Sequence, residues 1–326
     1  MSEFDYKIYS NSPATHWIMG VFNSHASGRE LTLSKEIKLG ERVSERMNQV
    51  KYSYESKDCI GELIVQEFNK KLPATSQLAM IFILIKGNHQ NWRNNKAVFQ
   101  IEDFINFKGE EVNKVTREVA RRQLKETMKR LLDCKIEIKY NSRSKKCALI
   151  NLLASYNYDN GFCTVEFPSS VVESLNIYPQ LFPSWGGKLT NQKSFAVTIY
   201  VYYRIKQAKK HNGVVKINVG DLLAYAGIPY AKEQVNNRRY KQLIVQPFLK
   251  AVEEIHLLCG KTLEINIPDY GNIDEFLNSY VIVNYDQAVA NYYTDKSKSK
   301  TRKARSEVNE PKSSKPSQRV SQRAVS

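Results

Sequence analysis

The sequence predicts an α+β fold: two winged-helix domains in tandem, with a basic disordered C-terminal tail. The first observation is a weak internal repeat, because residues 99–109 (FQIEDFINFKG) and 217–227 (INVGDLLAYAG) share a pattern about 118 residues apart. Only two of the eleven positions are identical, Asp103/Asp221 and Gly109/Gly227, so the pattern matters more than the letters. The second observation is the order of predicted elements, since each copy follows an apolar helix and precedes an Arg-bearing helix and strand-rich sequence. The third is a net charge of +16.

Residues 1–72 are predicted to form an N-terminal extension that is partly helical. Helical patterns run from about Glu41 to Lys51 and from about Ile60 to Lys70. Pro73 follows, and Thr75 or Ser76 suits the N-cap of the next helix, so the first winged-helix domain is placed at residues 73–167.

The first domain is expected to begin with three helices and a short strand. Leu78–Lys86 is apolar enough to be a core helix, Val98–Gln100 is the strand, and Ile101–Phe107 is the second helix. The third helix, Thr116–Leu132, is amphipathic because its apolar residues recur at helical spacing. These residues are Ala120, Leu124, Met128 and Leu131.

Strand patterns complete the first domain. Lys135–Tyr140 alternates Ile with charge, and a polar turn over residues 141–145 leads to a return strand, Cys147–Tyr156. Asp159-Asn160-Gly161 is a strong hairpin signal before the strand Phe162–Phe167. The turn over residues 141–145 is expected to be the DNA-contacting wing, with Arg143 and Lys145 (and the following Lys146) near phosphates.

Prolines and a Gly-Gly pair divide the rest of the chain. Residues 168–191 are predicted to be a connector at a domain boundary, with a short helix at Ser169–Leu175. The second winged-helix domain is placed at residues 192–286, with Lys193–Lys210, Asp221–Tyr225 and Lys232–Val245 as its helices. Pro247 is expected to restart a helix, and two strands, Lys261–Ile267 and Ser279–Tyr285, form its hairpin.

The C-terminal tail, residues 287–326, is predicted to be disordered. From Lys296 onward it has no aromatic residue. It carries ten Lys or Arg and two acids, a net charge of +8, which is half of the chain's net charge of +16. Such a segment cannot bury enough apolar surface to fold alone.

Charge and composition point to nucleic acid. The 326 residues are 42% apolar, enough for two domain cores, and the basic excess favours a polyanionic partner. No apolar run approaches the roughly 18–20 residues that span a bilayer. The chain also opens without a charged-then-apolar leader. We therefore expect a cytoplasmic protein with no membrane partner.

The predicted helix Lys232–Val245 carries the candidate sequence-reading residues. On a helical wheel its apolar arc holds Tyr240, Leu243 and Ile244, and its other arc mixes amides with basic residues. Arg can pair with guanine, and Asn or Gln with adenine, in the major groove. A solvated polar face is the alternative for such an arc, but the position of this helix as the third of a winged helix favours DNA. The candidates are Gln234, Asn237, Arg238, Arg239, Lys241 and Gln242.

The equivalent helix of the first domain has a basic face with few amides. Arg121, Arg122, Lys125 and Lys129 lie away from its apolar stripe. Because Lys and Arg alone suit phosphates better than base edges, we predict that the second domain reads sequence and the first holds the backbone. An ordinary solvated helix is the alternative. The second hairpin turn carries Asp269, Asp274 and Glu275, which disfavours phosphate contact.

Signals for catalysis or metal binding are weak. Gly186-Gly187-Lys188 and Gly260-Lys261-Thr262 both fail the phosphate-loop pattern, and the histidines are far apart. The Tyr200–Tyr203 cluster lies on a helix that reads as core. The five cysteines show no metal-ligand spacing and are expected to be reduced thiols. We therefore predict no enzyme activity and no cofactor. The cysteines are Cys59, Cys134, Cys147, Cys163 and Cys259.

The chain resembles the iteron-binding, tandem winged-helix replication initiators of plasmids over about Pro73–Asp286. The resemblance rests on the doubled pattern, on IEDFINF and VGDLLAYAGI, and on RRYKQLIVQPFLKAVEEI. It implies binding to repeated origin sites, a homodimer formed through the first domain, and recruitment of host helicase, without DNA cleavage. It also implies that Asn237, Arg238, Arg239 and Lys241 contact bases or phosphates. A transcriptional regulator on the same framework is the leading alternative, and a tyrosine-dependent nicking enzyme is a further one.

Overall fold

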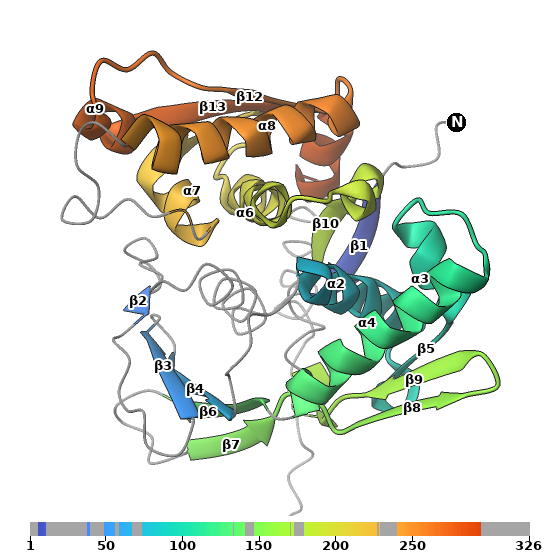
Figure 1. Cartoon of the computed structure of the whole chain (residues 1–326). Helices are drawn as coiled ribbons and strands as arrows, with labels where there is room; N and C mark the ends of the chain where they lie inside the picture. The colour runs from blue at the N-terminus through green and yellow to red at the C-terminus, as the bar shows by residue number, and fades with distance from the viewer. Residues whose placement is uncertain are drawn as a thin grey trace, which may run out of the picture.

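Two bodies with the same order of helices and strands make up most of the computed structural model (Figure 1). In that view the second body, coloured yellow to red, lies above the first, coloured teal to green. The structure describes residues 6–10, 38–39, 49–55, 59–66, 74–132, 134–140, 147–169, 171–172, 179–226, 228 and 240–294.

The first body has three helices packed on a three-stranded antiparallel sheet of order β5-β9-β8. A short 3₁₀ turn, η2 (Arg93–Asn95), precedes β5. The main elements are α2 (Ala74–His89), β5 (Lys96–Gln100), α3 (Ile101–Phe107), α4 (Lys114–Leu132), β8 (Ser155–Asp159) and β9 (Phe162–Glu166). The four apolar residues predicted to form the stripe of α4 are all buried, at no more than 1% exposed, which confirms that helix.

The second body repeats this topology, with a sheet of order β11-β13-β12. In both sheets the last strand in the chain is therefore the central one. Its elements are α6 (Gln192–Gln207), β11 (Val214–Asn218), α7 (Val219–Tyr225), the π turn η4 (Lys241–Val245), α8 (Gln246–Cys259), β12 (Leu263–Asn266), α9 (Ile273–Asn278) and β13 (Tyr280–Tyr285).

The internal repeat extends beyond the eleven residues that share a sequence pattern. The bounds of α2 and α6, of β5 and β11, and of α3 and α7 each differ by 118 residues. Lys86 of α2 forms an ion pair with Asp103 of α3 at 2.9 Å. At the equivalent positions, burial raises the pKa of Asp221 on α7 and the charge of Arg204 on α6 partly offsets that rise. A basic and an acidic residue thus occupy equivalent positions on the first two helices of each body, and among the described residues Lys86 and Asp103 form an ion pair there.

A separate five-stranded sheet of order β2-β3-β4-β6-β7 changes two expectations. Its strands are β2 (Lys38–Leu39), β3 (Gln49–Glu55), β4 (Cys59–Gln66), β6 (Cys134–Tyr140) and β7 (Cys147–Asn151). The helix expected over Ile60–Lys70 is wrong where β4 lies, and the one expected over Glu41–Lys51 is wrong at its end, where β3 begins. β4 pairs with the neighbouring β3 and with the distant β6, and this pairing in the sheet overrides the local helical pattern.

The sheet also corrects the identity of the first wing. The β6–β7 hairpin pairs with β4, whereas β9 pairs with β5 and β8 in the sheet of the first body. The wing of the first body is therefore β8–β9, turning at Asp159-Asn160-Gly161. Asn160 and Gly161 have φ of 48° and 85°, the left-handed pair that a two-residue hairpin turn requires.

The predicted connector is packed rather than exposed. β10 (Pro179–Pro183) pairs antiparallel with β1 (Tyr6–Ser10), and a 3₁₀ turn, η3 (Ser184–Lys188), follows. Leu181, Phe182 and Trp185 are buried. The prolines and glycines of residues 179–187 mark a change of chain direction inside the structure. From sequence alone, such residues look the same in a packed turn and in a surface linker.

The second body ends later than expected. Residues 287–294 are helical, and Val289 and Ala290 in them are fully buried. The Tyr293 hydroxyl accepts a hydrogen bond from the Leu181 backbone N–H at 3.3 Å. The first part of the predicted tail is thus folded, while the rest lies outside the described residues. No helix in the described ranges is long and apolar enough to span a bilayer.

Candidate nucleic-acid interface

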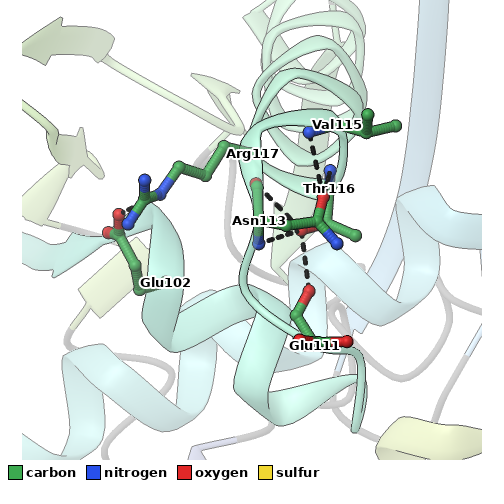
Figure 2. A network of polar contacts seen from close by, with 6 residues as sticks. All are labelled: Glu102, Glu111, Asn113, Val115, Thr116 and Arg117. Carbon is green, nitrogen blue, oxygen red and sulfur yellow. Dashed lines mark hydrogen bonds and ion pairs between the residues drawn. The ribbon is translucent and has the colours of Figure 1, made fainter.

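The N-terminus of α4 is capped by side chains at the start of the helix, as Figure 2 shows. The Asn113 side-chain oxygen accepts hydrogen bonds from the backbone N–H groups of Val115 and Thr116, both at 2.9 Å. In return, the Thr116 hydroxyl oxygen accepts one from the Asn113 backbone N–H at 2.9 Å. This reciprocal cap, with donation from the same hydroxyl to the Glu111 carbonyl, fixes where the helix begins.

An ion pair sets the orientation of α4 against α3. The Arg117 Nε donates to Glu102 Oε1 at 2.8 Å, and both side chains are visible in Figure 2. Because both groups are partly exposed, the pair contributes orientation more than stability. Arg117 is therefore engaged within the protein, one turn before the predicted phosphate-contacting residues.

The face of α4 opposite its buried stripe carries three exposed cations together with two exposed carboxylates, Glu118 and Glu126. The side chains of Arg122, Lys125 and Lys129 are exposed, as predicted. Among the described residues, none of these three forms an ion pair. Three exposed cations at helical spacing on one helix face suit contact with a row of phosphates.

Arg121 is engaged differently from its three neighbours. Its guanidinium carbon lies 4.7 Å from the ring centre of Tyr158 on β8, a cation–π contact that joins α4 to the first wing. The contact leaves the charge of Arg121 in place while fixing its position. Between Ser155 and Glu166 the wing itself has no Lys or Arg.

The predicted wing contacts Arg143 and Lys145 lie outside the described residues. The strands that flank them, β6 and β7, belong to the five-stranded sheet, so the reason for placing them on a wing of the first body was wrong. Their contact with DNA stays a prediction from charge alone.

In the second body, the start of the predicted reading helix lies outside the described residues. Gln234, Asn237, Arg238 and Arg239 are all in that part of the chain. Lys241 and Gln242 are described, and both are exposed.

The inner face of this helix differs from the predicted arc at one position. Tyr240 and Ile244 are buried, as predicted, but Leu243 is 42% exposed. The π turn η4 has more residues per turn than an α-helix, so it rotates Leu243 out of the predicted arc.

The helix expected to restart at Pro247 is α8, which has Pro247 in its first turn, although no break in the helical backbone precedes it. Tyr240, Val245 and Gln246 all have right-handed helical φ and ψ, so η4 runs directly into α8. Pro247 cannot donate a backbone hydrogen bond, and it falls in the first turn of α8, where the preceding change of hydrogen-bond spacing accommodates it.

Glu254 anchors this long helix near its middle. Its Oε1 accepts from the Thr190 backbone N–H at 2.8 Å and from the Thr190 hydroxyl at 2.6 Å. Its Oε2 accepts from the Asn191 backbone N–H at 3.2 Å. Burial alone would raise the pKa of Glu254, but the hydrogen bonds from Thr190 and Asn191 favour the carboxylate, so the pKa is lowered and the group stays charged.

The second wing region is acidic. The hairpin of β12 and β13 contains the unpredicted helix α9, whose Ile273 and Phe276 are buried. Asp274 and Glu275 occupy its first turn and are exposed, as is the preceding Asp269. This agrees with the prediction that the second wing disfavours phosphate.

Four parts of the interface were not found from sequence. The Arg117–Glu102 pair, the Arg121–Tyr158 contact and the Glu254 anchor each join elements that are separate in the chain, so no local pattern indicates them. The Asn113–Thr116 cap differs, because an Asn three residues before a Thr at a helix start is a local signal that could have placed the start of α4.

The described side chains offer little reactive chemistry. Among them, no group of three or more His, Cys, Asp or Glu is placed to hold a metal ion. Cys163 and Cys259 are buried free thiols, and burial raises the pKa of Cys163 to about 11. Tyr200 and Tyr202 are buried in the core, as predicted.

Comparison with known proteins gives structural similarity only. No protein-family model matches the sequence, and no curated protein matches it. The chain is structurally similar to the Pi initiator protein solved in complex with iteron DNA, with 15% identity and a TM-score of 0.44 over 66% of this chain and 91% of that one. Two structures of domains 2 and 3 of RctB are also similar. One has 12% identity and a TM-score of 0.47 over 83% of this chain and 98% of that one. The other has 13% identity and a TM-score of 0.44 over 84% and 99%. These values do not assign the chain to a family.

Proposed function

We propose that this chain binds double-stranded DNA sequence-specifically, through two winged-helix bodies and without catalysis, to initiate replication at an origin. The observation that carries DNA binding is the face of α4. Arg122, Lys125 and Lys129 are exposed without an ion pair among the described residues, on a helix whose opposite face is fully buried. In a chain of net charge +16, such a face attracts the phosphate backbone.

The two bodies are proposed to divide the work. The face of α4 contacts phosphates and fixes the position of the protein on the duplex. The second body reads base edges with amide and basic side chains between Gln234 and Gln242, of which Lys241 and Gln242 are described and exposed. The remaining reading residues are Gln234, Asn237, Arg238 and Arg239.

The origin, the homodimer and the host helicase enter the proposal from the resemblance of the sequence motifs to plasmid initiators. A transcriptional regulator is the second candidate, because it would use the same groove-reading helix. The difference lies in the consequence of binding, since an initiator opens the duplex beside its sites and a regulator does not.

A footprint of the protein on its own replicon tests the proposal. We expect protection of direct repeats spaced by about two helical turns, together with reactivity of unpaired thymines to permanganate in adjacent DNA. Protection without opening would favour the regulator. A nick or a covalent adduct on supercoiled DNA with a divalent metal would refute the non-catalytic assignment.

The base-reading role is tested separately by Arg238→Ala. We expect a loss of on the order of 1–3 kcal/mol in specific binding and little change on random duplex. Equal losses on both duplexes would contradict base reading.

A further inference from the structure

The segment that joins the two bodies, residues 184–191, contacts both candidate DNA-binding helices through short, unbroken links. We infer that this segment is a rigid spacer that fixes the separation of α4 and the η4–α8 helix, so that the protein accepts DNA sites of one spacing only. The inference rests on the proposed function and specifies how a site is selected.

The first link is a backbone contact between η3 and α3. Gly187 is buried, and a Cβ atom at this position would overlap the Phe107 carbonyl oxygen. The neighbouring Lys188 side chain lies against Gly109, where a Cβ would be 3.1 Å from its Cε. The two segments are therefore in direct contact, and only glycine permits that approach at residue 187.

The second link passes from α3 to α4. Lys108, at the end of α3, has a side chain that is only 9% exposed. Its Nζ lies 2.7 Å from Glu110 Oε1 and donates to Gln123 Oε1 on α4 at 3.3 Å. Glu110 compensates the charge of this largely buried cation, and the hydrogen bond to Gln123 joins the cation to α4.

The third link is the Glu254 anchor on α8. Thr190 and Asn191 at the end of the spacer donate to both oxygens of this carboxylate. Asn191 is also the N-cap of α6, accepting from the Lys193 backbone N–H at 2.9 Å. One carboxylate therefore joins the spacer, the start of α6 and the long helix of the second body.

A small change in the direction of the helix near Glu254 would move the reading residues at its start by a larger distance. Lys241 lies thirteen residues before Glu254 on one continuous helix, or about 20 Å at 1.5 Å per residue. A tilt of about 15° around Glu254 would move Lys241 by about 5 Å, which exceeds the rise of about 3.4 Å per base pair. The Glu254 hydrogen bonds hold α8 against the spacer, and the buried Val252 and Ile255 hold its direction, so together they keep the spacing of the contacts within about one base pair.

The test compares Glu254→Gln with Glu253→Gln, its exposed neighbour on the same helix. Each variant and the unchanged protein would be titrated against the duplex that the unchanged protein selects from a random pool. The titrations would be repeated on duplexes with one base pair inserted or removed between the segments that the two bodies protect. Circular dichroism and thermal unfolding would establish that each variant is folded.

We expect the affinity of the unchanged protein and of Glu253→Gln to fall about tenfold on either altered spacing, the cost of removing one base-edge hydrogen-bonding pair. Glu254→Gln should lose about threefold or less on the same duplexes. An identical spacing profile for all three proteins would overturn the inference. If Glu254→Gln does not fold, Thr190→Val, which removes one of the donors, decides by the same criterion. If the unchanged protein selects no duplex, the proposed function fails instead.

Discussion

Removing the three exposed cations of α4 should change the salt dependence of DNA binding more than its sequence preference. The perturbation is the triple substitution Arg122→Ala, Lys125→Ala and Lys129→Ala, at exposed positions opposite the buried stripe. Each cation that no longer neutralises a phosphate should reduce the slope of log affinity against log salt by about 0.9. Three such cations give a reduction of about 2.7, so between 50 and 200 mM salt the affinity of the unchanged protein should fall about 40-fold more than that of the variant.

The assay is fluorescence anisotropy on a selected duplex and on a random duplex, at several salt concentrations. A matched control removes three other exposed lysines, Lys209, Lys210 and Lys261, which lie between elements and off α4. The control changes the net charge equally, so it isolates position from charge. The reasoning is refuted if the control reduces the slope as much as the α4 variant does, or if the α4 variant leaves the slope unchanged.

Three further predictions concern the framework. Leu124→Ala should lower the free energy of unfolding, measured with denaturant, by about 2–5 kcal/mol, because the side chain is fully buried. The control Val115→Ala, on the same helix but 71% exposed, should change it by less than about 0.5 kcal/mol. Gly187→Ala should lower the free energy of unfolding, measured with denaturant, by about 1–3 kcal/mol, since its Cβ would overlap the Phe107 carbonyl. An unchanged midpoint would show that the backbone can shift to make room for the methyl group. Glu254 has a lowered pKa, so its contribution is present above its unfolded value near 4.5 and is lost as pH falls through the folded value. The unfolding free energies of the unchanged protein and Glu254→Gln should therefore differ at pH 7 and approach each other as the pH falls below about 4.5, and a difference that does not shrink in acid would contradict the assignment.

Local signals predicted the repeated framework well. The helix Ile101–Phe107 was predicted with the bounds that the structure shows, because Asp103 and the Gly109 stop are both local signals. The turn at Asn160-Gly161 followed from the left-handed backbone that those two residues favour. The stripe of α4 followed from helical spacing, which depends on no distant partner.

Features created by distant partners could not be predicted from one sequence. β4 is a strand because β3 and β6 flank it, and its own residues read equally well as a helix. The wing was misplaced because two hairpins follow α4, and only pairing with β5 shows which one belongs to the first body. Glu254 shows the same limit within the site, since its partners at Thr190 and Asn191 are more than sixty residues away.

The two bodies differ where a difference of function would be expected. Up to the second helix they share bounds displaced by 118 residues, and a basic and an acidic residue occupy equivalent positions on their first two helices. After that point they diverge. The third helix of the first body carries its own cap at Asn113 and is joined to its wing through Arg121 and Tyr158. The third helix of the second body is held from outside, by the spacer at Glu254. A locally capped basic helix needs only to present charge, whereas a helix that reads bases must be placed to within about one base pair. The anchor from the spacer therefore occurs on the helix whose proposed task requires it.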